Sequence, residues 1–174
     1  MKILFILLII GLFWEHLAFT QPVVRVWGSK DSLAVIIQVE QYLDILDIHE
    51  HVYINIGFST LMPEKLKGIT SCISSPEPKT NQIIKVRIDA RMNETQQKLV
   101  LAHEMIHVKQ YVKGQIKVLD ERLVNWKGNI YEYKGSKSLR YSPWEYEAYR
   151  NDQILADLCT DQSGTPLIAI VKMQ

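Results

Sequence analysis

The sequence predicts an α+β fold in which a small mixed sheet packs on a central helix. Three segments alternate apolar and polar side chains as half-buried strands do: residues 23–27, 51–58 and 83–90. Three other segments show helical spacing or helix-capping residues: 30–47, 93–113 and 143–159. Because no linker or internal repeat divides these elements, a single domain is expected over residues 21–174.

Residues 1–20 differ in kind from the rest and predict a targeting segment. Met1-Lys2 gives a positive start, and Ile3 to Trp14 is apolar except for Gly11. About a dozen apolar residues suit a signal peptide and are few for a membrane crossing. Ala18-Phe19-Thr20 would permit cleavage before Gln21. A cleaved signal peptide and an uncleaved membrane anchor both stay open, and both predict an exported protein, periplasmic or extracellular.

The first strand, Val23 to Trp27, is rich in β-branched residues and ends at Gly28-Ser29. The following helix is expected to bury its apolar positions, which are Leu33, Ile36, Ile37, Leu43 and Leu46. Residues 51–58 alternate again as a strand. Residues 59–80 contain three prolines and a glycine, and they predict loop with one short strand near residues 69–73.

The strand at 83–90 has the clearest alternation in the chain. Ile84, Val86 and Ile88 point to one side, and Lys85, Arg87 and Asp89 point to the other. A polar outer face is compatible with an edge strand. If this strand lies at the sheet edge, a peptide could bind beside it as an added strand.

Helix boundaries are marked by local residues. Asn93 and Gln96 predict a capping box that opens the second helix, and Gly114 predicts its end. Residues 115–141 are expected to form one or two hairpins. Ser142-Pro143 opens a last helix that runs to about Cys159, and residues 166–171 are apolar enough for a terminal strand.

Charge and cysteine content narrow the classes of protein. Twenty basic and nineteen acidic residues give a net charge of +1, without a run of like charges, so no nucleic-acid partner is expected. Cys72 and Cys159 are the only cysteines. After export they could form one disulfide, or they could remain two separate buried thiols.

The residues that carry chemistry are His103-Glu104-Met105-Ile106-His107. Histidines four residues apart lie on one face of a helix, so both imidazoles can bind one metal ion. The glutamate between them can act as a general base toward a metal-bound water. The pattern predicts a Zn²⁺ site with His103 and His107 as ligands and Glu104 as the catalytic base.

A catalytic zinc site needs a third protein ligand. Gln110 and Lys113 stand where the extended metzincin motif has glycine and histidine, and no histidine follows His107, so a carboxylate is favoured over His49 or His51. Glu145 and Glu147 lie on the last helix, where at most one can face the metal.

Between these two carboxylates, Glu145 is predicted, because Ala148 on the same face would allow close helix packing. Glu147 remains the alternative ligand. A capping box with Ser142 is a competing role for Glu145.

The motif, followed 38 residues after His107 by Glu145-Tyr-Glu-Ala148, resembles the gluzincin zinc peptidases. The parallels are the minigluzincins, the ImmA/IrrE-like peptidases and the CAAX-processing peptidases. The resemblance implies a zincin-like fold in which the C-terminal helix supplies Glu145 as the third zinc ligand. Two positions depart from the pattern: Tyr149 replaces a supporting Asp or Asn, and Lys109 replaces an apolar residue.

The predicted function is zinc-dependent hydrolysis of peptide bonds in a peptide or protein substrate. The alternative is an exported metal-binding or interaction protein with an inactive peptidase-like site. A membrane is expected as a partner only if residues 1–20 stay uncleaved. An aromatic cluster is expected either to line a cleft or to form a small core; it comprises Trp126, Tyr131, Tyr133, Tyr141 and Trp144.

Overall fold

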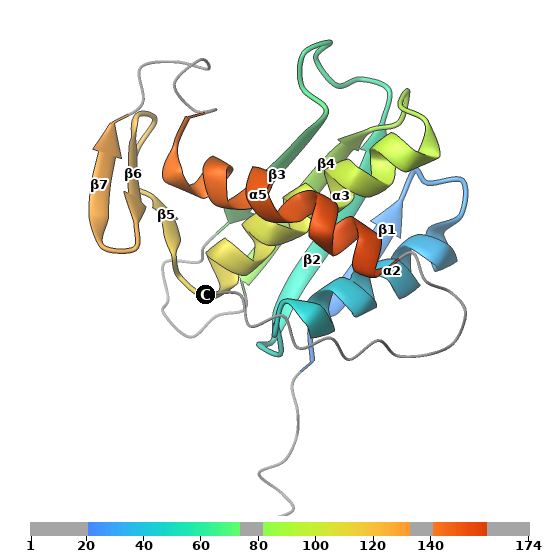
Figure 1. The fold of residues 1–174 in the computed structure, drawn as a ribbon, viewed down its shortest axis with the longest axis horizontal. Coiled ribbons are helices and arrows are strands. Elements are labelled where there is room, and N and C mark those ends of the chain that lie inside the picture. The colour runs from blue at the N-terminus through green and yellow to red at the C-terminus, as the bar shows by residue number, and fades with distance from the viewer. Residues whose placement is uncertain (1–20, 74–81, 133–140, 160–174) are drawn as a thin grey trace, which may run out of the picture.

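The computed structural model describes residues 21–73, 82–132 and 141–159. This part of the chain forms three α-helices and two small sheets, which confirms the predicted α+β class (Figure 1). The predicted targeting segment, residues 1–20, and the predicted terminal strand, residues 166–171, lie outside the described residues. Among the helices that are described, none has the length and apolar character that a membrane crossing requires.

The larger sheet has four strands in the order β1-β2-β4-β3. They are β1 (Val23–Trp27), β2 (Val52–Ser59), β3 (Gly68–Ile73) and β4 (Gln82–Asp89). β1, β2 and β4 run parallel, and β3 pairs with β4 in the antiparallel sense. The four predicted strands are therefore confirmed, but β4 lies inside the sheet. The edge position next to it belongs to β3, so a docking role for residues 83–90 is wrong.

One face of this sheet carries the helices, and the core lies between them. Helices α2 (Ser32–Ile45) and α3 (Glu94–Val112) pack on the sheet, and α5 (Pro143–Leu158) packs on α3 (Figure 1). Ile84, Val86 and Ile88 are fully buried beneath α3, as predicted, while Lys85 and Arg87 are exposed. Asp89 is buried instead of exposed, because the guanidinium of Arg91 pairs with it at 2.7 Å.

The buried face of α2 agrees with the predicted one only in the second half of the helix. Leu33 and Ile37 are 67% and 47% exposed. The predicted Leu43 and the following Leu46 are buried, together with Val39 and Tyr42, which were not predicted. These four positions also share one helical face, so apolar spacing alone allowed two orientations of this helix.

Both ends of α3 form as the sequence predicts. The side chain of Asn93 accepts a hydrogen bond from Gln96 N at 2.9 Å, and the Gln96 side chain accepts one from Asn93 N. At the other end Gly114 adopts φ +65°, and Gln115 N donates to Gln110 O at 2.8 Å, which closes a Schellman motif. The motif residues therefore lie in the middle of a helix with both ends satisfied.

The three short strands β5 (Ile116–Val118), β6 (Leu123–Trp126) and β7 (Asn129–Glu132) form a second, antiparallel sheet, which confirms two hairpins. Trp126 and Trp144 are buried together with Ile116 and Val124, so the tryptophans form a small core rather than an open wall. Tyr133 lies outside the described residues. Cys72 and Cys159 are free thiols, which decides against the disulfide alternative.

Candidate metal centre

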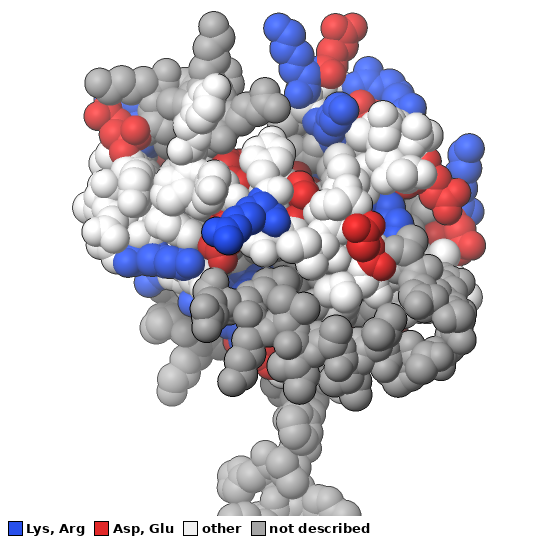
Figure 2. All heavy atoms as spheres, in the orientation of Figure 1, with Lys and Arg blue, Asp and Glu red and all other residues white. Residues whose placement is uncertain are grey.

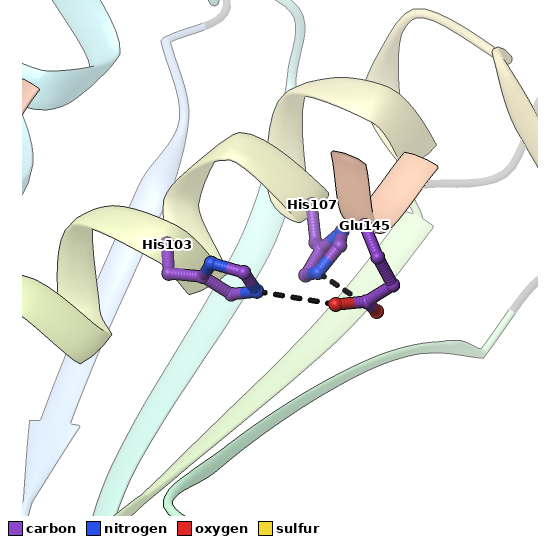
Figure 3. A group of neighbouring side chains, drawn as sticks. All are labelled: His103, His107 and Glu145. Atoms are coloured by element: carbon purple, nitrogen blue, oxygen red, sulfur yellow. Dashed lines mark ion pairs between the residues drawn. The ribbon is translucent and has the colours of Figure 1, made fainter. Parts of the chain in front are cut away.

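Two helices bring three metal-binding side chains to one point. His103 and His107 project from adjacent turns of α3, and Glu145 projects toward them from the first turn of α5 (Figure 3). His103 Nε2 lies 3.4 Å from Glu145 Oε2, and His107 Nε2 lies 3.3 Å from Glu145 Oε1. One ligand atom from each of the three lies within 4.8 Å of the others. The group could therefore hold a metal ion.

The distance from each histidine to its nearer Glu145 oxygen is one that two ligands of a single metal ion can have. Ligand bonds of about 2.1 Å place neighbouring tetrahedral ligands roughly 3.4 Å apart, and both histidine–carboxylate distances are close to that value. Ala148, on the same helix as Glu145, is fully buried. Its small side chain permits the close approach of α5 to α3 that these distances require.

The competing capping role for Glu145 is wrong. Ser142 is the N-cap residue of α5, but within the described chain its side chain makes no capping hydrogen bond. The carboxylate of Glu145 is directed at the histidines instead. Proline at the first helical position already removes one of the N–H groups that a cap would satisfy.

The other candidate ligands have different partners. The carboxylate of Glu147 lies 3.3 Å from Lys127 Nζ and accepts a hydrogen bond from Gln110 Nε2 at 3.4 Å. His49 pairs with Asp47 at 3.1 Å, and the ring of His51 meets Tyr53 edge-on. These three candidates lie outside the group of metal-binding side chains in the described part of the chain.

Hydrogen bonds on the outer side of each imidazole orient it. His103 Nδ1 lies 3.2 Å from Asp152 Oδ2, and His107 Nδ1 lies 2.8 Å from Gln110 Oε1. Since a carboxylate oxygen and an amide oxygen only accept, each Nδ1 carries the proton. Each Nε2 is left facing Glu145, from where it can bind a metal ion or, when protonated, donate to the carboxylate.

Asp152 and Gln110 are functional candidates that the sequence interpretation did not assign to these roles. Asp152 lies seven residues after Glu145, two helical turns along the same face. Its carboxylate contacts His103. In the gluzincin-like pattern a supporting Asp or Asn would stand at position 149, where this chain has Tyr149. The ring of Tyr149 instead lies 4.5 Å from the His103 ring.

Hydrogen bonds and neighbouring charges shift the pKa values of Glu145 and His107. Burial alone would raise the pKa of Glu145, but hydrogen bonds from His103 and His107 outweigh it and lower this pKa to about 2. Burial alone would lower the pKa of His107, but the Glu145 hydrogen bond and the Glu104 charge raise it. The surroundings therefore favour the charged forms of His107 and of Glu145.

Glu104 lies on the side of α3 that faces β3. Its side chain is buried, at 4% exposure, and Thr70 Oγ1 lies 2.6 Å from its Oε2. Burial raises the pKa of Glu104, against the opposing charge of His107 and the Thr70 hydrogen bond. A raised pKa is typical of a carboxylate that exchanges protons at a reaction centre.

The molecular face that carries α5 and α3 has no single-sign charged surface. Acidic and basic side chains are interspersed on it, with uncharged surface between them (Figure 2).

In comparisons with protein-family models, curated proteins and solved structures, nothing matched this chain. The functional conclusions therefore rest on the residues and their geometry.

Gln110 is expected to act on the metal through His107. Its amide is fully buried, and besides holding His107 it donates to Trp144 O at 3.1 Å, which ties α3 to the start of α5. Gln110→Leu should weaken zinc binding by about 10- to 100-fold, as losses of such supporting partners do. Competition with a chromogenic chelator would measure this affinity.

Gln97→Leu is the matched control for that measurement. Gln97 lies on the same helix and hydrogen-bonds Ala90 O and Met92 O, away from the metal-binding group. It should keep zinc affinity. Equal affinities in both variants and the wild type would contradict the role of Gln110.

Proposed function

We propose that this protein is a zinc peptidase of the gluzincin type with a zincin-like fold. The observation that carries the proposal is the convergence of His103, His107 and Glu145 from two helices, with the buried carboxylate of Glu104 close enough to interact with their charges. We assign zinc to this group because two imidazoles and one carboxylate hold the catalytic zinc of peptidases, and Glu104 stands between the histidines where their general base stands.

The count of ligands favours a catalytic site over a structural one. Structural zinc sites use four protein ligands, commonly cysteines, whereas catalytic sites keep one position for water or substrate. In the described residues the group contains three ligands. The Glu145 side chain keeps 21% of its surface exposed, so solvent reaches the group from that side.

Different residues of the chain would carry out proton transfer and hold the metal ligands in place. A bound zinc ion supplies Lewis acidity, which polarises a carbonyl and lowers the pKa of water. Glu104 accepts the proton of the attacking water and later transfers it to the leaving amine. Asp152 and Gln110 hold the tautomers of His103 and His107 throughout.

The edge strand β3 is where we propose that the substrate binds. Among the described strands β3 pairs only with β4, so within the described residues its other edge has no strand partner and an extended polypeptide can add there as a strand. β3 also packs against α3, which carries the histidines and Glu104. The substrate class is therefore a peptide or a protein with an extended segment. The apolar residues 3–14 support export as part of the same proposal.

Metal removal tests the proposal directly. Protein purified after expression of the full chain should contain one zinc per chain by elemental analysis. It should cleave members of a diverse peptide library, detected by mass spectrometry. Treatment with 1,10-phenanthroline should abolish cleavage, and added Zn²⁺ should restore it. Cleavage that persists in zinc-free protein would contradict the proposal, and a zinc-loaded protein without cleavage would favour the inactive alternative.

A further inference from the structure

Position 68 on β3 has room for a glycine and for nothing larger. A methyl group on Gly68 would lie 2.4 Å from Glu104 Oε1 and 2.6 Å from Val100 Cγ1. Both distances are far below van der Waals contact. The backbone of Gly68 is not in the left-handed region, so the missing side chain is what matters here. Gly68 lets the carboxylate of Glu104 lie directly against the backbone of β3.

Thr70 lies two residues further along β3, on the same face of the strand. Its Oγ1 is 2.6 Å from Glu104 Oε2 and 3.3 Å from the Glu104 carbonyl oxygen. A hydroxyl has one proton to donate. The shorter distance is typical of a hydroxyl that donates to a charged carboxylate, so the proton is assigned to Oε2.

Within the described residues, the side-chain hydrogen bond to the Glu104 carboxylate comes from β3. Thr70 is the residue that hydrogen-bonds it within the described part of the chain. A buried carboxylate with a single such partner depends on that partner for its orientation. Oε1 lies over Gly68 and Oε2 is held by Thr70, so both oxygens are placed by one strand.

We infer that Thr70 and Gly68 position the general base Glu104. One strand, β3, would then hold both the base and the substrate. The inference rests on the proposed peptidase function. The strand to which an extended substrate would add also holds the carboxylate that transfers protons to and from it. Thr70 is thus a positioning residue that acts through Glu104, and Gly68 provides the space for the positioned carboxylate.

Thr70→Val tests the hydrogen bond, because valine keeps the shape of threonine without the hydroxyl. In zinc-loaded protein kcat should fall by roughly 10- to 100-fold, as expected for a misplaced catalytic group. KM and zinc content should stay close to wild type. Thr70→Ser restores a hydroxyl and should recover most of the lost kcat.

Ser71→Ala is the matched control. Ser71 neighbours Thr70 on the same strand, but its side chain is exposed on the opposite face. Removing its hydroxyl should leave kcat unchanged. A fall in kcat for Thr70→Val that comes with loss of zinc or of thermal stability would overturn the positioning role, because Thr70 would then act through the fold.

Crystal structures of the zinc-free variants supply a readout that does not depend on activity. In Thr70→Val and Gly68→Ala the Glu104 carboxylate should leave its wild-type position, and in Thr70→Ser it should remain. An unmoved carboxylate together with an unchanged kcat would overturn the inference. A wild type that binds zinc and cleaves nothing would instead refute the proposed function, and the crystal structures would still decide whether β3 positions Glu104.

Discussion

Glu145→Ala is expected to abolish stoichiometric zinc binding. Glu145 is the only carboxylate that joins the two histidines in the described group, and both Nε2 atoms lie within 3.4 Å of its oxygens. Losing a supporting hydrogen bond costs about 10- to 100-fold in metal affinity, and losing a direct ligand should cost more. Elemental analysis after dialysis would measure the remaining zinc.

Glu147→Ala provides the control for this experiment, since Glu147 lies two residues away on the same helix. Its carboxylate pairs with Lys127 at 3.3 Å and is 28% exposed, so zinc content should be close to wild type. Full zinc in Glu145→Ala together with loss in Glu147→Ala would overturn the ligand assignment. The same pair of variants would then identify Glu147 as the ligand.

Glu104→Gln is expected to keep zinc and to lose peptide hydrolysis. Glutamine has the shape of glutamate and can still accept a hydrogen bond from Thr70, but it cannot take a proton from water. Removal of a general base typically costs about 10²- to 10⁴-fold in rate. Steady-state assays on a peptide that the wild type cleaves, with zinc measured in parallel, would test this.

The same variant separates the two functions predicted from the sequence. If the protein is a peptidase, Glu104→Gln should lose hydrolysis. Glu94→Gln, which changes a glutamate at the exposed start of the same helix, should keep full activity. Equal hydrolysis by wild type and Glu104→Gln would refute Glu104 as the base. An exported binding protein with an inactive site would show no hydrolysis in any of the three proteins.

Local patterns explain why much of the fold was predictable. The alternation in residues 83–90 depends only on the twofold repeat of a strand, and the capping box at Asn93 involves side chains three residues apart. Both therefore formed where expected. The face of α2 was predicted correctly at Leu43 and Leu46 and wrongly at Leu33 and Ile37, because apolar spacing alone does not say which of two overlapping faces the sheet covers.

Much of the candidate site was less predictable, because its supporting groups meet across long stretches of chain. Thr70 reaches Glu104 from an edge strand, and the order of strands that puts β3 there is not encoded in any local pattern. Asp152 carries a helical signal, since it shares a face with Glu145. That signal becomes informative only when α5 is known to pack against His103.

The sequence by itself determined that His103 and His107 share a face with Glu104 between them, because helical periodicity is a local property. Only the tertiary structure decided that Glu145, rather than Glu147, faces the two imidazoles and makes no capping bond. The physical reason is the packing of α5 on α3 at the fully buried Ala148. That packing sets the helix rotation, and a rotation of two residues exchanges one carboxylate for the other.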